Sequence, residues 1–182
     1  GMFVSNISFG IPVLASIKDA ADIVMDVHLM IEEPIRYVEA FHKAGADILN
    51  VHYEACEDVQ ATLDAIHKCG MKAGLTIKPA TPVEVLKPYL DQAELFLIMS
   101  VEPGKGGQSF IPESLDKIRE LRGLLNEKGL TADVEVDGGI HLGNAKEVLE
   151  AGANVLVAGS AVFKDNIAEN VKGFMEILNE NE

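Results

Sequence analysis

The chain has 182 residues, of which 48% are hydrophobic, and we expect one globular domain spanning residues 1–182. It carries 29 acidic against 15 basic residues, a formal net charge of −14, which argues against nucleic acid because such binding depends largely on neutralised phosphates. An apolar run of about 18 residues, which a membrane span needs, is missing, and so are the basic and apolar regions of a signal peptide.

Six apolar runs indicate β-strands, and they are mostly continuous, as expected for strands covered on both faces. In chain order they are residues 25–30, 47–53, 72–77, 95–101, 132–137 and 155–160. Helical patterns follow them at residues 33–44, 58–69, 82–90, 112–128, 143–151 and 166–179. Glycines that suit the left-handed end of a helix close four of these patterns, at Gly45, Gly70, Gly129 and Gly152.

Strands that alternate with helices through short links predict parallel βαβ units, which build either a doubly wound open sheet or a barrel. The glycine-rich fingerprint of dinucleotide-binding open sheets is missing. A barrel instead predicts polar residues around one rim, at the carboxyl ends of its strands. The chain has such residues at His28, His52, Lys78, Ser100, Asp137 and Ser160. We therefore expect an α/β fold of the TIM (β/α)8 barrel type.

Two rim residues are candidates for chemistry, His28 in "MDVHLM" and Asp137 in "EVDGGI". A lone histidine at a strand end is more often a satisfied core residue. A carboxylate there is costly unless its charge is used, which favours a role for Asp137. Together the two side chains can bind a divalent metal or move protons, and the residues alone leave both alternatives open.

Glycines follow the last two predicted strands, where barrels often bind phosphate at the start of a helix. Gly138 and Gly139 precede one helix, and Gly159 and Ser160 precede "AVF", a candidate short extra helix. A tight turn between strand and helix explains either pair alone. Both pairs together favour a small phosphate held by backbone N–H groups, which even an acidic protein can bind.

A long loop, "SVEPGKGGQSF" over residues 100–110, follows the fourth predicted strand. Its proline and three glycines indicate either a lid or a second phosphate contact. Met30 and Met99 stand beside candidate polar residues, although methionine in such places is usually core filler.

In order and spacing, these motifs resemble the ribulose-phosphate 3-epimerase family over essentially the whole chain. The similar stretches are "NISFG", "MDVHLMIEEPIRYVEAFHKAGAD", "VHYEA", "LIMSVEPGKGGQSF", "VDGGI" and "VAGSAVF". The resemblance implies an isomerase of the pentose phosphate pathway that interconverts D-ribulose 5-phosphate and D-xylulose 5-phosphate. Such an epimerase removes the proton beside a ketone and returns one to the opposite face, through an enediolate stabilised by a divalent metal.

The resemblance also implies roles for single residues. Asp137 matches one of two aspartates that act as acid and base and bind the metal, and His28 matches one of two histidine ligands. Zinc, iron, manganese or cobalt fills the metal role, and Met30 and Met99 match methionines that line the site. His52 has a place at the rim but is not expected as a ligand. The matching substrate and phosphate contacts are His28, Gly104, Lys105, Gly106, Gly107, Gly138, Gly139, Gly159 and Ser160.

The match starts late, because the family has a first strand, a first helix and a second strand before the point that aligns with Gly1. We expect an incomplete barrel of about six of eight βα units. The other catalytic aspartate and the other metal histidine would then be missing, and a shortened sequence is favoured over a natural short variant. Open edges on strands 25–30 and 155–160 favour a homo-oligomer or a rearranged N-terminal segment. We expect weak metal binding and low activity.

The leading hypothesis is a metal-assisted sugar-phosphate 3-epimerase that acts on a phosphorylated ketose. D-allulose 6-phosphate is the near alternative substrate, because phosphate contacts do not separate five carbons from six. A non-catalytic sugar-phosphate binder is the alternative from another class. Cys56 and Cys69 match no metal or redox spacing, and two reduced thiols fit a cytoplasmic protein.

Overall fold

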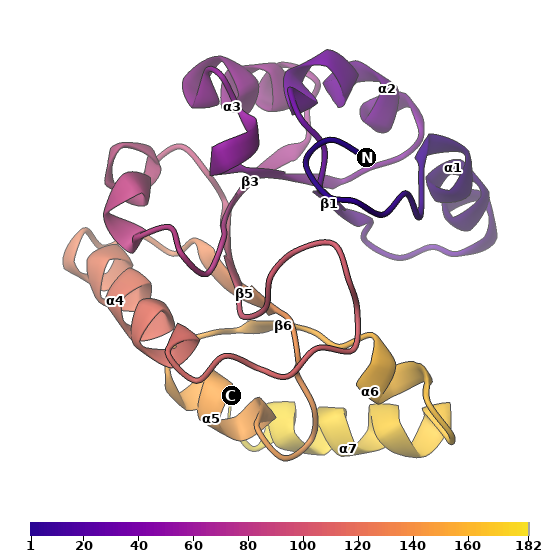
Figure 1. Ribbon diagram of the computed structural model, residues 1–182, viewed down its shortest axis with the longest axis vertical. Helices are drawn as coiled ribbons and strands as arrows, with labels where there is room; N and C mark the ends of the chain where they lie inside the picture. The colour runs from indigo at the N-terminus through magenta and orange to yellow at the C-terminus, as the bar shows by residue number, and fades with distance from the viewer. Residues whose placement is uncertain (182) are drawn as a thin grey trace.

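The computed structural model describes residues 1–181, and within them six parallel strands form one curved sheet (Figure 1). The strands are β1 (Asp26–Leu29), β2 (Ile48–His52), β3 (Lys72–Ile77), β4 (Leu95–Met99), β5 (Asp133–Asp137) and β6 (Val155–Val157). Each strand pairs with the next along the chain, from β1 to β6. All strands therefore end at the same rim, as predicted.

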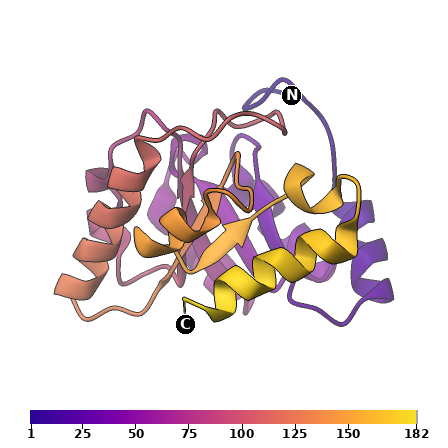
Figure 2. The same cartoon turned by 90° about the horizontal axis from the view of Figure 1, so that it is seen from below.

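Helices cover the outer face of the sheet (Figures 1 and 2). The α-helices are α1 (Ile11–Ala20), α2 (Val38–Lys43), α3 (Val59–Lys68), α4 (Ser114–Glu127), α5 (Ala145–Glu150), α6 (Ser160–Phe163) and α7 (Ile167–Asn179). Shorter 3₁₀ helices are η1 (Pro34–Tyr37), η2 (Tyr53–Ala55) and η3 (Val83–Tyr89). This arrangement is an incomplete TIM-type barrel, which confirms the predicted fold class. β1 and β6 end the strand order, so in residues 1–181 each pairs with one neighbour.

The helices differ from the predicted ranges for local reasons. The predicted helix over residues 82–90 is the 3₁₀ helix η3, and Pro88 inside it disfavours an α-helix because its ring would clash with the carbonyl four residues earlier. The predicted helix over residues 33–44 divides into η1, which begins at Pro34, and α2. The predicted strand over 155–160 ends at Val157, because the chain already turns toward α6.

Helix α1 was not predicted from the sequence. Pro12 lies in its first turn, where a proline starts a helix well, but none of its residues is buried. Ile11 and Leu14 pack against the core while Val13 and Ile17 are exposed, so its apolar residues form no single stripe that marks it. Lys18 anchors the helix to the start of β2 through an ion pair with Asp47, at 2.8 Å.

Two apolar clusters hold the sheet in place. The larger lies between the strands and the helices and includes Phe96 and Ile98 of β4. The smaller lies inside the curve of the sheet and contains Leu95, Leu97 and Met99. The two sets alternate along β4 because successive side chains of a strand point to opposite faces.

A buried polar contact crosses the interior below the rim. The Asn50 amide on β2 donates to Glu135 on β5 at 3.0 Å and accepts from the Thr76 hydroxyl at 2.7 Å. The Glu135 residue is 4% exposed, and burial, aided by the charges of Asp26 and Asp137, raises its pKa to about 8. The contact joins two strands that lie on different sides of the barrel.

Both cysteines are half-buried free thiols, as predicted for Cys56 and Cys69. Burial raises the pKa of the Cys56 thiol to about 11, so it is not an activated nucleophile. Over the described residues, 1–181, no helix combines the length and apolar character needed to cross a membrane.

Candidate active site

A cavity of about 570 Å³ opens at the rim where the strands end. Residues at the ends of β1, β4, β5 and β6 and in the loop after β4 form its wall. It contains every site residue predicted from the sequence: His28, Met30, Met99, Gly104, Lys105, Gly106, Gly107, Asp137, Gly138, Gly139, Gly159 and Ser160. The curvature of the sheet thus collects residues that are far apart in the chain, while their individual roles stay predictions.

His28 on β1 and Asp137 on β5 lie next to each other in this cavity. Nδ1 of His28 is 3.6 Å from Oδ2 of Asp137, and both side chains are partly exposed. A tetrahedral metal with bonds of about 2.1 Å holds its ligands about 3.4 Å apart, so the pair fits as two ligands of one ion. Across residues 1–181, no cluster of three or more His, Cys, Asp or Glu side chains is placed to hold a metal.

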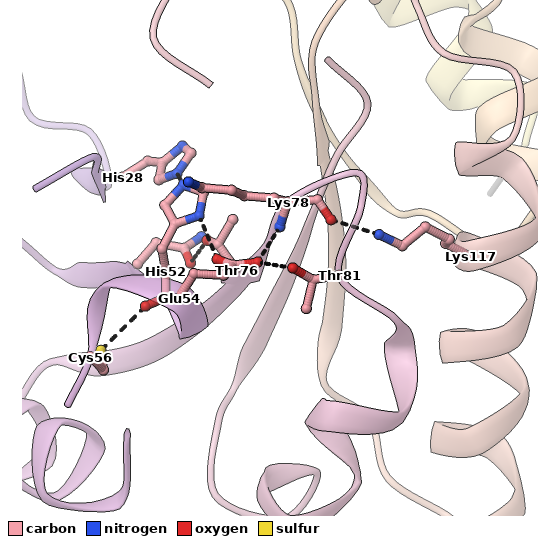
Figure 3. A network of polar contacts seen from close by, with 9 residues as sticks. His28, His52, Glu54, Cys56, Thr76, Lys78, Thr81 and Lys117 are labelled. Carbon is pink, nitrogen blue, oxygen red and sulfur yellow. Dashed lines mark hydrogen bonds and ion pairs between the residues drawn. The ribbon is translucent and has the colours of Figure 1, made fainter. Parts of the chain in front are cut away.

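His52, at the end of β2, lies next to His28, and their rings face each other (Figure 3). Its side chain is fully buried, and its Nε2 is 2.8 Å from Nε2 of His28. Burial lowers the pKa of His52 to about 4 and so favours the neutral ring near pH 7. The sequence predicted His52 at the rim but not as a metal ligand. In the structure its ring contacts His28, the candidate ligand.

Glu54 in η2 contacts His52 behind the cavity wall, and the sequence did not predict it. Its Oε2 is 3.2 Å from Nδ1 of His52, and its Oε1 accepts hydrogen bonds from the Lys78 N–H, at 2.7 Å, and the Thr81 hydroxyl. Burial alone raises the pKa of Glu54, but these hydrogen bonds outweigh it and lower the pKa to about 2. The available signal was "VHYEA", in which a glutamate follows the rim histidine by two positions.

The glycines on the β5–β6 side are not equivalent. Gly138 and Gly139 have φ angles of 127° and 65°, and a Cβ on Gly139 would lie 2.3 Å from the backbone nitrogen of Phe110. Gly159 has a φ of −82°, which suits any residue, and nothing lies within 4 Å of the place its Cβ would take. The fold therefore requires glycine at 139 but not at 159, where open space borders the cavity.

Ser100, another predicted rim residue, contacts the backbone at the end of β5. Its Oγ lies 3.0 Å from the carbonyl oxygen of Asp137 and 2.7 Å from that of Gly138. The residue is completely buried and is not part of the cavity wall. Ser100 thus fixes the backbone that carries Asp137.

Residues of the loop after β4 and of the N-terminal segment, residues 1–9, line the cavity, and the two segments lie side by side in Figure 2. The Asn6 amide donates to the carbonyl oxygen of Gly104, and a Cβ on Gly104 would lie 2.9 Å from Val4. Gln108 braces the loop from within by donating to the carbonyls of Glu102 and Lys105. The loop therefore has a defined closed position, and its opening as a lid stays a prediction.

Comparison with known proteins identifies close relatives. The Ribulose-phosphate 3 epimerase family matches residues 1–163. The chain is 51% identical to ribulose-phosphate 3-epimerase of Synechocystis sp. over 176 residues, which cover 95% of this chain and 76% of that protein. It is 49% identical to the protein of the same name from Bacillus subtilis over 164 residues, which cover 90% and 76% of the two chains.

Solved structures share the fold at much lower sequence identity. The 3-hexulose-6-phosphate synthase of Salmonella typhimurium gives a TM-score of 0.72 at 17% identity, covering 95% of this chain and 82% of that one. A 3-keto-L-gulonate-6-phosphate decarboxylase of Vibrio cholerae gives 0.71 at 15% identity, covering 95% and 80%. These likenesses concern the barrel fold alone. The sequence relatives carry the further conclusion that this chain belongs to the ribulose-phosphate 3-epimerase family.

Proposed function

We propose that this chain acts as a sugar-phosphate 3-epimerase that interconverts D-ribulose 5-phosphate and D-xylulose 5-phosphate. The observation that carries the proposal is the pairing of His28 with Asp137 in a cavity with glycine turns on its other side, in a chain about half identical to ribulose-phosphate 3-epimerases. A carboxylate beside an imidazole is suited to removing a proton next to a ketone.

In this proposal Asp137 moves the proton on the substrate carbon beside the ketone, on the face turned toward β5. His28 and Asp137 are the residues that would hold a divalent metal: zinc, iron, manganese or cobalt. When bound, such an ion supplies positive charge to the enediolate oxygens. Met30 and Met99 place apolar side chains beside the reacting carbon and keep water away from it.

The phosphate end of the substrate is assigned to the turns after β5 and β6. Ser160 begins α6, and the first N–H groups of a helix have no partner within that helix. Gly159, which borders open space, lets the backbone approach an anion closely, and Gly139 allows the tight turn after β5. Lys105, in the loop over the cavity, adds a positive charge to a chain that is acidic as a whole.

Inversion also needs a proton on the opposite face of the substrate. Within residues 1–181, the carboxylates that line the cavity are those of Asp137 and Glu102, and Glu102 lies exposed in the loop. We therefore expect complete inversion to be much slower than proton exchange at the Asp137 face. With two protein ligands, we also expect weak metal binding.

A non-catalytic sugar-phosphate binder is the second candidate function. It is favoured by the small number of candidate metal ligands, His28 and Asp137, within residues 1–181. D-allulose 6-phosphate is the alternative substrate, because no contact in the cavity measures the length of the sugar.

We also propose a cytoplasmic single-domain protein that forms a homo-oligomer through the open edges of β1 and β6. A monomer by light scattering would contradict the oligomer.

Proton NMR in D₂O tests the proposed function. The chain is incubated with Zn²⁺ and, in separate samples, D-ribulose 5-phosphate and D-xylulose 5-phosphate. We expect deuterium to enter at the third carbon of one epimer faster than that carbon inverts. Asp137→Asn should abolish this exchange, whereas Asp116→Asn, on the exposed face of α4, should leave it unchanged.

Each other outcome of this experiment also decides something. Binding of either sugar phosphate without exchange would favour the binder. Faster exchange with D-allulose 6-phosphate would change the substrate. Rapid inversion of both pentulose phosphates would show that another residue supplies the second proton. The proposed function fails if none of the three sugar phosphates binds or exchanges.

A further inference from the structure

The contact between two histidine rings restricts where their protons lie. Nε2 of His28 and Nε2 of His52 are 2.8 Å apart, and the ring centroids are 4.9 Å apart (Figure 3). At this distance one nitrogen must donate a proton and the other must accept it. The direction of this hydrogen bond therefore determines which nitrogen of neutral His28 remains without a proton.

Glu54 determines that direction. Its Oε1 accepts from the Lys78 N–H and the Thr81 hydroxyl, and its Oε2 faces Nδ1 of His52 at 3.2 Å. A carboxylate can only accept hydrogen bonds, so His52 must carry its proton on Nδ1. The neutral His52 ring then has a bare Nε2, which accepts from its neighbour.

The consequence for His28 follows at once. It donates from Nε2 to His52, so its Nδ1 is the bare nitrogen, and this atom faces Oδ2 of Asp137 at 3.6 Å. The opposite pattern would place a proton on Nδ1, but 3.6 Å exceeds the normal hydrogen-bond range of about 2.7–3.2 Å. It would also leave a bare nitrogen of His52 facing the Glu54 carboxylate and lose a charge-assisted hydrogen bond.

We propose that His52 and Glu54 are positioning residues that fix His28 with its proton on Nε2 and present its bare Nδ1, beside Asp137, to a divalent cation. A histidine ligand held from behind in this way keeps its orientation and gains basicity. The use of that cation in epimerisation rests on the proposed function. The proton positions themselves are a property of the chain without metal or substrate.

NMR of the imidazole nitrogens in the metal-free, ¹⁵N-histidine-labelled chain reads these proton positions directly. Measurement at about pH 8 keeps ordinary histidines neutral. Replacing the exposed His42 and His141 by glutamine leaves three rings to assign, of which His67 is exposed and lies outside the cavity wall. We expect the proton on Nε2 of His28 and on Nδ1 of His52. A proton on Nδ1 of His28 would overturn the proposal, and this result requires no variant at Glu54.

Glu54→Gln should move the proton of His28 and of His52 to the other nitrogen of each ring. The backbone N–H of Lys78 can only donate and so requires the side-chain oxygen of the amide, which leaves the NH₂ group facing Nδ1 of His52. His52 then donates from Nε2, and His28 carries its proton on Nδ1. A purely structural role for Glu54 would leave the proton positions as they are, so unchanged rings in a folded variant would overturn the proposal.

Glu94→Gln is the matched control, because Glu94 contacts the exposed His67, at 3.1 Å, away from the cavity. It should leave His28 and His52 unchanged. Titration with Zn²⁺, followed by the His28 signals, should show binding about 10- to 100-fold weaker for Glu54→Gln than for the parent chain. If the protons move in Glu54→Gln but its affinity for Zn²⁺ equals that of the parent chain, the proposed effect of the proton positions on metal binding would be overturned. Absence of sugar-phosphate turnover would bear on the proposed function alone.

Discussion

The two sides of the rim are built in different ways. On β1 and β2, polar side chains contact one another from His28 through His52 to Glu54. On β5 and β6, glycines expose the backbone, and at Gly139 the fold itself requires one. The side that supplies the candidate metal ligand His28 thus depends on side-chain protons, while the side that carries Asp137 and the assigned phosphate contacts depends on the shape of the main chain.

This difference predicts how each side responds to substitution. On the side-chain side, an exchange of Glu for Gln keeps the volume and changes the charge and the proton pattern. On the backbone side, the informative substitution is Gly→Ala, which adds a single methyl group. It tests whether the space beside the glycine Cα is filled by the protein or open to a ligand.

The largest effect is expected from Gly139→Ala. The residue has a left-handed φ of 65°, and the new Cβ would overlap the backbone of Phe110, which is rigid. We expect a loss of about 3 kcal/mol in the free energy of unfolding, measured by urea denaturation. Gly123→Ala is the control: Gly123 lies in α4 with nothing within 4 Å of the added atom, and there we expect a gain of about 0.5–1 kcal/mol. Equal stability of the two variants would contradict the difference drawn between glycines.

A second prediction concerns Glu135, which joins the two sides beneath the cavity through Asn50. Its pKa is raised from 4.5 to about 8 in the folded chain, so folding favours its protonated form. The resulting stability is complete below pH 4.5 and is lost as the pH rises through about 8. Between about pH 6.5 and about pH 8.5 we expect the free energy of unfolding to fall by about 1–2 kcal/mol.

Glu135→Gln should remove this fall, because an amide carries no charge at any pH in the window. The pKa of Asp26, raised to about 6 by burial, and the pKa of His52, lowered to about 4, place their main effects at lower pH. Urea denaturation at several pH values provides the measurement, with exposed Glu120→Gln as the control. A fall of equal size in Glu135→Gln would show that another group causes it.

The backbone side was easier to predict from the sequence than the side-chain side. Buried strands produce continuous apolar runs, so the strand order and the rim positions of His28 and Asp137 follow from the pattern. Glycine pairs after the last two strands are equally visible. Glu54 was missed because its contact with His52 depends on a 3₁₀ turn that no apolar period marks. Helix α1 was missed because its apolar residues lie on both its packed and its exposed side and form no single stripe.

The sequence also could not separate the two kinds of glycine. "GG" at 138–139 and "GS" at 159–160 both follow a predicted strand, and each pattern is consistent with a tight turn or with a phosphate contact. Only the surroundings of each missing Cβ distinguish them: protein backbone at Gly139 and open cavity at Gly159. That distinction leads to the prediction with the smallest expected effect.

Gly159→Ala should keep the fold and weaken binding of the sugar phosphate. Because its φ is −82° and the added methyl group meets nothing, we expect stability equal to or slightly above that of the parent chain. The methyl group would enter the space where we place the phosphate, so affinity for D-ribulose 5-phosphate should fall about 5- to 10-fold, or about 1 kcal/mol. An NMR titration with the sugar phosphate measures this, with Gly123→Ala as the control that leaves affinity unchanged. If Gly159→Ala binds as tightly as the parent chain, the phosphate does not approach the turn after β6, and the assignment of the backbone side would be limited to Gly138 and Gly139.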